Sequence, residues 1–227
     1  MITLCLTTWN RDSMTFDAFR QVLNDDRISE IVIVDDCSDE RIYNNLAFMV
    51  NGIGKVKLYR NETNLGCYHN KRKSVELAQN EWVIVFDSDN ILTKEYLDNI
   101  PEVWVKTNIY QPEFARPHFD FRKFSGTVVS AFNVKNYMRL PHFTTMLNAM
   151  NFFINRDEFL KIPHRKEETW TADSIYFNYL WLKAGNKIYV TPGMQYDHLV
   201  HNGSHYKANV HKTGNFYNEV ERMLKEL

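Results

Sequence analysis

The first half of the chain alternates short β-rich runs with segments of helical periodicity, and this order constrains the fold more than any other feature. Strands joined by helices form crossover units, which build a mostly parallel sheet. The strand-like runs are almost continuously apolar, which is typical of strands covered on both faces. The expected strands cover residues 2–8, 31–34, 56–59 and 82–86, and the expected helices cover residues 14–24, 43–50 and 68–79.

The second half is less regular. Residues 111–126 mix Pro, His, Phe and Arg without a clear period, and we expect a loop-rich insertion there. Gly185 follows one expected helix, where a C-terminal glycine belongs. Because no repeat, low-complexity tract or linker divides the 227 residues, the sequence predicts one α/β domain with a smaller mixed second half. Further strands are expected at residues 128–134, 151–154 and 187–190, and further helices at residues 144–150, 173–183 and 216–227.

The charge balance argues against a nucleic-acid binder. Lys and Arg number 27 and Asp and Glu number 28, a formal net charge of -1, whereas phosphate contacts usually need a basic excess. Cys5, Cys37 and Cys67 match neither a disulfide framework nor a zinc motif, so we expect free thiols. The first residues lack a basic leader, and no apolar run approaches the roughly 20 residues of a membrane span. We therefore expect a soluble, cytoplasmic protein without a transmembrane segment.

Polar clusters follow three of the expected strands. They read TWNR at residues 8–11, DDCSD at residues 35–39 and DSDN at residues 87–90. Ligands of α/β sheets bind at the carboxyl ends of the strands, so these clusters mark an expected binding site. The first cluster lacks the glycine-rich turn of a dinucleotide site, which disfavours that kind of Rossmann domain.

Asp87 and Asp89 are two carboxylates separated by one residue, just past a buried strand. This spacing lets one carboxylate hold a divalent cation while the other binds a ribose hydroxyl or a water on the metal. Hard oxygen ligands favour Mg²⁺ or Mn²⁺, which can neutralise a diphosphate. The alternative is a solvated turn, because Asp, Ser and Asn are ordinary turn formers. The pair by itself leaves both interpretations open.

The segment NLGCYHNKRK at residues 64–73 leads a glycine-bearing loop into a helix. Backbone amides at the helix start, together with Lys71, would suit a phosphate or a base edge. The alternative is a solvated basic helix face behind a simple turn. Taken alone, the segment favours this alternative.

Five motifs follow one another between residue 2 and about residue 204. They read IVIVDDCSDE, NLGCYHNKRKSVELAQNEWVIVFDSDN, MNFFINRDEF, ETWTADSIYFNYLWLKAGNKIYV and YDHLVHNGS. Their order resembles the inverting family-2 glycosyltransferases of the GT-A (Rossmann-like) fold, which carry a V-D-D-G-S turn, an N-x-G helix start, a D-x-D metal motif, an E-D catalytic motif and a late H-x-G-S segment. The chain departs from this pattern where Cys37 replaces a glycine, Lys71 an arginine and Ala172 a glutamate.

The resemblance implies a role for each matching residue. Thr8 would face the base through its backbone, and Asp36 would accept the N3–H of uracil. Lys71 would contact the base or a phosphate, and Asp87 would bind the ribose. Asp89 would hold Mn²⁺ or Mg²⁺ on the diphosphate. The nucleotide-sugar site predicted in this way consists of Thr8, Asn10, Arg11, Asp36, Asn64, Lys71, Asp87 and Ser88.

Asp173 is the general base that the resemblance implies, taking the proton of the acceptor hydroxyl. Base catalysis of this kind contributes about 10²–10⁴-fold. The acid that the family places directly before it is missing, and Glu167 and Glu168 lie several residues upstream. The alternative role for Asp173 is that of a first-turn helix acid, which the helix dipole favours.

Histidines gather in the segment YDHLVHNGSHY. The H-x-G-S match selects His201 to complete the metal shell, and His198 is close enough in sequence to compete with it. Imidazole ligation would favour Mn²⁺ over Mg²⁺. At least one of the three histidines, which also include His205, is expected to be an ordinary surface residue.

The resulting prediction is a metal-dependent inverting glycosyltransferase that moves a sugar from a UDP-sugar, or less favourably a dTDP- or GDP-sugar, to a hydroxyl of a glycan or glycoconjugate acceptor. Residues 1–105 would form the nucleotide-binding half, and residues 106–227 the acceptor-binding and catalytic half. Trp170, Tyr176 and Phe177 would line the acceptor pocket or belong to the core.

Two alternative functions remain from the sequence. One is a nucleotidyltransferase acting on sugar phosphates, and the other is an inactive carbohydrate-binding relative of the same fold. The small size is similar to that of stand-alone enzymes of some large DNA viruses, which would act in the host cytoplasm.

Overall fold

The computed structural model describes residues 1–163, 170–200 and 205–227, with side chains at all of these positions except 170 and 205–213. The strands are β1 Ile2–Thr8, β2 Ile28–Asp35, β3 Val56–Arg60, β4 Trp82–Asp87, β5 Asn90–Ile91, β6 Asn108–Arg116, β7 Phe119–Asp120, β8 Val128–Val129, β9 Phe152–Asn155 and β10 Lys187–His198. The α-helices are α1 Asp12–Arg20, α2 Glu40–Val50, α3 Cys67–Leu77, α4 Lys94–Asp98, α5 Val134–Tyr137, α6 Phe143–Leu147, α7 Arg156–Lys161, α8 Asp173–Lys183 and α9 His205–Lys225, with 3-10 turns at Arg122–Phe124 and Trp170–Ala172.

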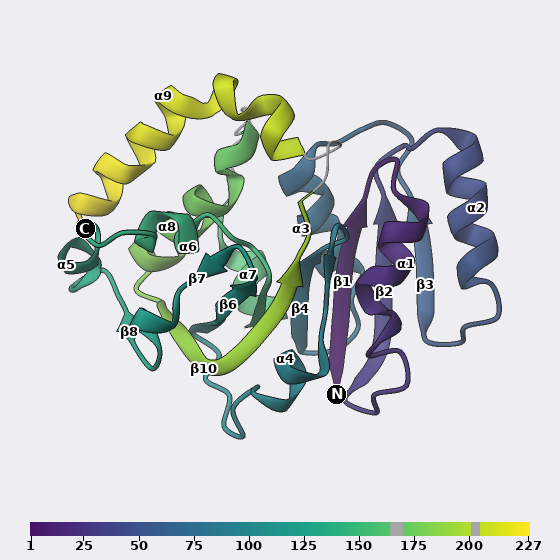
Figure 1. The fold of residues 1–227 in the computed structure, drawn as a ribbon, viewed down its shortest axis with the longest axis horizontal. Coiled ribbons are helices and arrows are strands. Elements are labelled where there is room, and N and C mark those ends of the chain that lie inside the picture. Colours follow the sequence, from purple (N-terminus) through teal and green to yellow (C-terminus); the bar gives the residue numbers. More distant parts are fainter. Residues whose placement is uncertain (164–169, 201–204) are drawn as a thin grey trace.

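One continuous sheet runs through the molecule in the order β3-β2-β1-β4-β9-β6-β10-β5 (Figure 1). The first four strands along this path are parallel, as the alternation of strands and helices predicts. Strand β9 enters antiparallel between β4 and β6, while β6 and β10 pair in parallel. The carboxyl ends of β1, β2 and β4 therefore lie next to one another at the same edge of the sheet.

Each face of the sheet carries its own hydrophobic core. On one face, Leu4, Leu6 and Phe86 pack in a cluster with residues of α1 and α2. On the other, Cys5 and Val85 belong to a cluster that includes residues of α3, α8 and α9. Successive strand residues thus alternate between two covered faces, which explains why these strands read as almost continuous apolar runs. Figure 1 shows α9 arching over the half of the molecule that lies away from β1–β3.

Residues 111–126 correct one expectation, because β6 runs through the segment that we expected to be a loop-rich insertion. Pro112 makes this strand hard to predict from the sequence, because proline is rarely found inside a sheet. In the structure Pro112 lies opposite Thr191, where the pairing of β6 with β10 becomes irregular. The backbone N–H of Gly193 in this irregular stretch donates to the side chain of Glu113 at 2.8 Å. This irregularity accommodates Pro112, which has no backbone N–H to donate to the neighbouring strand.

Residues 128–134 correct a second expectation. The strand there is only β8, and α5 already begins at Val134. The side chain of Asn133 accepts the backbone N–H of Ser130 at 2.8 Å, which turns the chain directly after the strand. The apolar residues of this segment therefore serve two short elements rather than one long strand.

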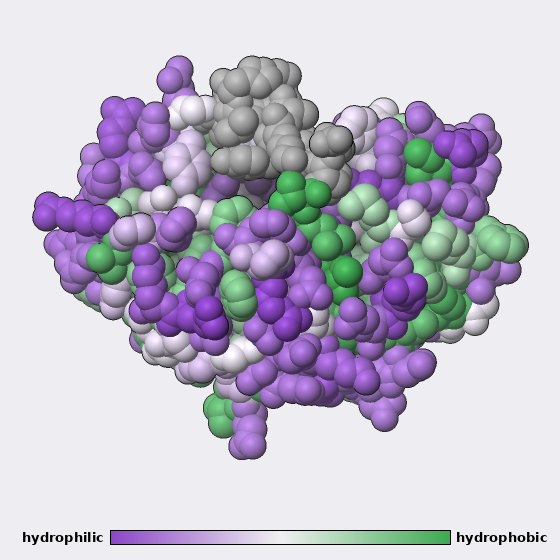
Figure 2. Space-filling model, viewed as in Figure 1, coloured by the Kyte–Doolittle hydropathy of each residue, from purple (hydrophilic) through white to green (hydrophobic). Residues whose placement is uncertain are grey.

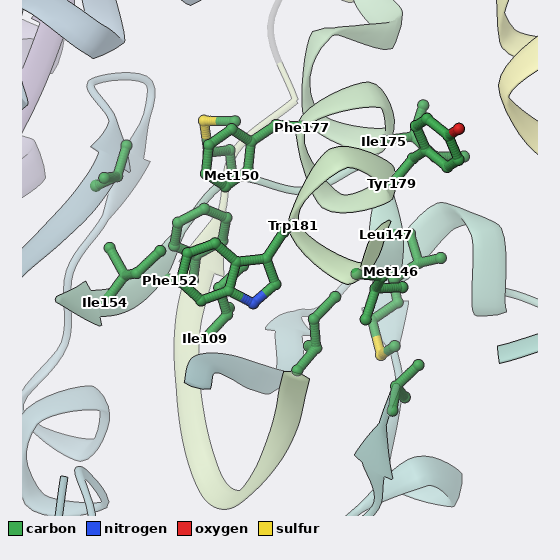
Figure 3. Close-up of a cluster of buried hydrophobic side chains, with 14 of the residues drawn as sticks. Ile109, Met146, Leu147, Met150, Phe152, Ile154, Ile175, Phe177, Tyr179 and Trp181 are labelled. Carbon is green, nitrogen blue, oxygen red and sulfur yellow. The ribbon is translucent and has the colours of Figure 1, made fainter. Parts of the chain in front are cut away.

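Helix α8 coincides with its predicted range and is buried around most of its surface. Figure 3 shows Phe177 and Trp181 pointing from the helix toward Phe152, while Ile175 and Tyr179 lie on its other side. The indole N–H of Trp181 donates to the carbonyl of Lys187 at 2.8 Å. Phe177 is fully buried in this hydrophobic cluster, so it is a core residue rather than part of an acceptor pocket.

One face of the molecule shows how polar and apolar residues share the surface. Figure 2 shows a largely hydrophilic face on which the hydrophobic residues form small separate groups. In the ranges 1–163, 170–200 and 205–227, no helix is both long and apolar enough to cross a membrane. All three cysteines are free, as expected.

Candidate active site

The polar clusters predicted at the strand ends come together at one edge of the sheet. Thr8 ends β1, and its carbonyl accepts the backbone N–H of Asp36 at 2.8 Å. Thr7 of β1 pairs with Asp87 of β4 on the other side. The central position of β1 thus brings the turns after β2 and β4 to either side of residues 8–11.

The carboxylate of Asp36 is buried, with 4% of the residue exposed, and holds the start of α3. Its Oδ1 accepts the backbone N–H of Leu65 and the side-chain amide of Asn61, both at 2.8 Å, and its Oδ2 accepts the N–H of Gly66 at 3.0 Å. Gly66 has φ +82°, a conformation that favours glycine. The side chain of Asn64 also accepts the Gly66 N–H, at 3.0 Å. The two loop amides that precede α3 therefore bind a carboxylate of the protein itself.

The turn after β2 is fixed by its neighbours. Asp35 accepts the backbone N–H of Ser38 at 3.0 Å. Asn10 accepts the N–H of Asp39 at 2.8 Å and donates its own N–H to the hydroxyl of Ser38 at 2.7 Å. Cys37 has φ +62°, so the position where the family pattern has glycine adopts a conformation that glycine favours. These contacts give Asn10 a role in shaping the turn.

The three acidic residues of the predicted site, Asp87, Asp89 and Asp173, lie beside two cationic side chains. Lys71 of α3 places its Nζ 3.0 Å from Oδ1 of Asp87 and 3.5 Å from Oδ2 of Asp173. Burial by itself would lower the pKa of Lys71, but the attraction of Asp173 and Asp87 outweighs it and raises the pKa above its ordinary value. Burial and the negative charge of Asp89 raise the pKa of Asp87 despite Lys71. The site therefore has an excess of negative charge.

Arg11 supplies the second cation. Its Nη1 lies 3.2 Å from Oδ2 of Asp89, and both side chains are partly exposed, at 17% and 19%. The carbonyl of Arg11 accepts the hydroxyl of Thr8 at 3.0 Å and also that of Thr15, which fixes the chain at the start of α1. The guanidinium of Arg11 thus pairs with Asp89, the carboxylate that the sequence predicts as a metal ligand. An accessible carboxylate that attracts a cation fits a hard divalent ion such as Mn²⁺ or Mg²⁺.

Asn151 was missed by the sequence analysis. Its Oδ1 accepts the backbone N–H of Asp87 at 2.7 Å, and its Nδ2 donates to the hydroxyl of Tyr196 at 3.2 Å. The hydroxyl of Tyr96 donates to its carbonyl at 3.1 Å. Asn151 is 3% exposed and precedes β9, so the antiparallel insertion of that strand beside β4 supports the acidic turn. The signal available in the sequence was a polar residue at the start of the apolar run in the motif MNFFINRDEF.

His198 ends β10 next to His118, another residue that the sequence analysis missed. The Nδ1 atoms of the two rings are 3.0 Å apart, and Nδ1 of His118 is also 3.0 Å from the carbonyl of His198. Because a carbonyl only accepts, we assign the proton to Nδ1 of His118. Nδ1 of His198 then accepts a hydrogen bond, which competes with metal ligation there. In the part of the chain that the structure describes, no three His, Cys, Asp or Glu side chains form a metal-binding group.

The remaining predicted residues divide into three groups. Ser88 is fully buried, and its hydroxyl has no hydrogen-bond partner among the described residues. Tyr176 is partly buried against the core and contacts Phe216. Glu167, Glu168 and His201, and the side chains of Trp170 and His205, lie outside the described residues.

Cys67, the first residue of α3, is a free thiol beside these charges. Burial, reinforced by the negative charge of Asp173, raises the pKa of its thiol to about 12. The group is therefore a neutral thiol at physiological pH and a poor nucleophile.

Comparison with known proteins agrees with this architecture. The fold is similar to that of TarS of S. aureus in complex with UDP-GlcNAc, with a TM-score of 0.72 and 16% identity over 96% of this chain and 66% of that one. A mannosyltransferase from Pyrobaculum calidifontis in complex with GDP-Man and Mn²⁺ has a TM-score of 0.64 and 12% identity, covering 93% and 60% of the two chains. These similarities confirm the expected GT-A fold.

Sequence comparison gives the family. A glycosyltransferase of Mycoplasma genitalium whose function is uncharacterised is 21% identical over 198 residues, which cover 84% of this chain and 66% of that protein. The chain spans between 24% and 66% of the length of the curated relatives that it matches. The family model described as "Glycosyl transferase family 2" matches residues 3–165, well over half of the chain. The chain therefore belongs to glycosyl transferase family 2.

Proposed function

We propose that this protein is a metal-dependent inverting glycosyltransferase, which moves a sugar from a nucleotide-sugar donor to a hydroxyl of a glycan or glycoconjugate acceptor. One observation carries the proposal. The acidic turn after β4 and the carboxylate at the start of α8 are joined through Lys71, at 3.0 Å and 3.5 Å. The group that would bind the donor and the carboxylate that would act as general base are therefore close together, which supports the proposal because transfer requires this proximity.

The donor side of the proposed site lies at the carboxyl ends of β1, β2 and β4. Asp87 would bind the ribose of the nucleotide, and Asp36 and Lys71 would lie near its nucleobase or a phosphate. Two similar structures contain UDP-GlcNAc and GDP-Man respectively. We favour a UDP-sugar, because Asp36 retains acceptor capacity on Oδ2, which receives one hydrogen bond from the protein. Residues 1–105 would form this half.

Asp89 would hold the divalent cation, with His198 or His201 as an additional ligand. The structure of the mannosyltransferase that resembles this chain contains Mn²⁺, and imidazole ligation would favour that ion over Mg²⁺. When bound, the ion supplies positive charge that stabilises a departing diphosphate. Arg11, next to Asp89, would supply further positive charge on the same side.

Asp173 would act as the general base. Its carboxylate takes the proton of the acceptor hydroxyl as that oxygen forms a bond to the anomeric carbon of the sugar. The bond between this carbon and the diphosphate oxygen breaks, and the nucleoside diphosphate leaves with the electron pair. A single displacement of this kind inverts the anomeric configuration. Asp173 is 7% exposed and lies at the first position of α8, a rigid element that fixes the backbone from which its carboxylate extends.

Donor binding is tested by calorimetry with UDP in the presence of Mn²⁺. We expect measurable affinity for the natural protein and a loss of at least about tenfold for Asp89→Ala, because the ion and the diphosphate bind together. Asp17→Ala is the matched control, since Asp17 also pairs with an arginine but lies on the outer face of α1. No UDP affinity in the natural protein, or equal affinity in the two variants, would contradict the proposal.

The base is tested by Asp173→Asn. UDP affinity should remain, while transfer falls by about 10²–10⁴-fold. Asp157→Asn is the matched control, because Asp157 is also an acidic residue in the first turn of a helix. If both variants lose activity equally, Asp173 acts only as a helix-stabilising acid. Donor binding without transfer or donor hydrolysis in the natural protein would instead indicate an inactive carbohydrate-binding relative.

A further inference from the structure

Lys71 connects the two chemical groups of the site. Its ammonium lies between Asp87, at the end of β4, and Asp173, at the start of α8, which is 102 residues further along the chain than Lys71. The side chain of Lys71 is 7% exposed and that of Asp173 is 9% exposed. The side chain of Asp87 is 32% exposed. Buried ion pairs are screened less than surface pairs, so the contact of Lys71 with Asp173 is the less screened of the two.

Helix α3 holds Lys71 in place from both sides of the domain. At its start, Gly66 donates to Asp36 at 3.0 Å, and the side chain of Asn70 donates to the carbonyl of Val34 at 3.0 Å. Farther along, Arg72 donates to the carbonyl of Leu160 at 2.8 Å and to that of Ile162 at 3.1 Å. The lysine therefore stands on an element that is anchored to β2 and to the end of α7.

Among residues 1–163, 170–200 and 205–227, few other groups restrain the oxygens of Asp173. Oδ2 faces Lys71, and Oδ1 accepts only a long hydrogen bond, at 3.4 Å, from the hydroxyl of Ser174 among the contacts of the described residues. Without Lys71, the carboxylates of Asp87 and Asp173 would repel each other, and the side chain of Asp173 would turn away. The direction of Asp173 thus depends on the lysine.

We propose that Lys71 is a positioning residue for Asp173, holding this carboxylate toward the donor while it also holds Asp87. The proposal rests on the assignment of Asp173 as the base. It assigns to Lys71 a function beyond a contact with the nucleobase or a phosphate. The carboxylate proposed to bind the ribose, Asp87, and the proposed general base, Asp173, share one cation, so the ammonium of Lys71 would align the general base with the donor.

The test compares single-turnover transfer rates of Lys71→Met, Asp173→Asn and the double variant. Lys71→Met should lower kcat by roughly 10–100-fold, a part of the contribution of the base, with a smaller change in the donor KM. The double variant should transfer at the rate of Asp173→Asn within about threefold, because the lysine acts through the aspartate. Losses that multiply in the double variant, or a change confined to the donor KM, would overturn the proposal.

Two further variants protect this test from effects on folding. Lys71→Arg keeps the charge and should retain transfer within about tenfold of the natural rate. Lys57→Met removes a lysine that pairs with the buried Glu30 at 2.7 Å, and should leave kcat unchanged. If Lys71→Met does not fold, the double variant, which removes one charge of each sign, is still compared with Asp173→Asn. Absence of UDP binding by the natural protein would contradict the proposed function itself, and is measured separately.

Discussion

The guanidinium of Arg11 lies 3.2 Å from the carboxylate of Asp89, the residue that we assign to the divalent cation. Arg11 follows β1 and Asp89 follows β4, and these strands are neighbours in the sheet. The guanidinium of Arg11 is thus already paired with the carboxylate that would coordinate the metal ion. If Asp89 binds the ion as we propose, Arg11 and the metal ion would compete for one carboxylate as long as no diphosphate is present to attract Arg11.

Arg11→Met is therefore expected to strengthen the binding of Mn²⁺ to the protein without nucleotide, by up to about fivefold, because an ion pair of this exposure contributes up to about 1 kcal/mol. The same variant should weaken UDP binding in the presence of Mn²⁺. Titration of free Mn²⁺ by electron paramagnetic resonance measures the first effect, and calorimetry the second. Arg20→Met is the control, since Arg20 pairs with an exposed acid on the same helix. Unchanged Mn²⁺ affinity in Arg11→Met would rule out the competition.

His198 and His118 give a second prediction about the metal. Because Nδ1 of His118 donates toward His198, removal of His118 takes one hydrogen bond away from Nδ1 of the candidate ligand. Mn²⁺ affinity should then stay equal or rise in His118→Ala, and fall in His198→Ala if His198 is a ligand. His69→Ala, on an exposed position of α3, serves as the control. Equal losses in the His118 and His198 variants would indicate that both rings bind the ion.

Asn151→Ala should reduce both stability and donor binding. The substitution leaves the N–H of Asp87 and the hydroxyl of Tyr196 without this partner, which costs about 1–3 kcal/mol of the free energy of unfolding. Urea unfolding measures this loss of stability, and calorimetry with UDP measures how far the displacement of Asp87 weakens donor binding. Asn155→Ala is the matched control, because Asn155 is equally buried at the other end of β9 and caps α7. It should lose about 1 kcal/mol of stability and keep its UDP affinity; loss of affinity in both variants would assign the effect to general destabilisation.

Glu30 gives a prediction for pH. It is 5% exposed and accepts Thr3 at 2.7 Å, Gln79 at 2.8 Å and Lys57 at 2.7 Å. Burial opposes its charged form, but these partners prevail and hold the pKa of Glu30 below its ordinary value. A carboxyl with a lowered pKa stabilises the folded state above its unfolded pKa of about 4.3. This stabilisation disappears as the pH falls through the folded-state pKa.

Glu30→Gln is thus expected to lower the free energy of unfolding at pH 7 by about 1–3 kcal/mol, and the difference from the natural protein should shrink below about pH 4.3. Urea unfolding between pH 7 and pH 3 measures it. Glu76→Gln, which removes an exposed partner of Arg72, should show a small difference at every pH. A constant difference for Glu30→Gln would mean that the charge of Glu30 does not contribute.

The strands of the first half were predictable because each carries its own signal. The range expected for β1 is identical to the observed one, and those for β2, β3 and β4 differ only at their ends. Continuous apolar runs indicate strands covered on two faces, and such a run is a pattern of neighbouring residues that can be read from the sequence. Strand β6 was not predictable in this way, because Pro112 is tolerated only through an irregularity in β10, some 80 residues away.

The sequence by itself determined the parallel α/β core, the acidic turns at the strand ends and the likeness to a family of sugar transferases, since apolar periodicity and short motifs are properties of neighbouring residues. Only the tertiary structure decided which groups meet. Lys71 pairs with Asp173, Arg11 with Asp89 and Asn151 with Asp87. Each contact joins elements that are distant in the chain, and the order of strands in the sheet brings them together. Charge pairing over a few ångströms depends on this packing, and no local pattern encodes it.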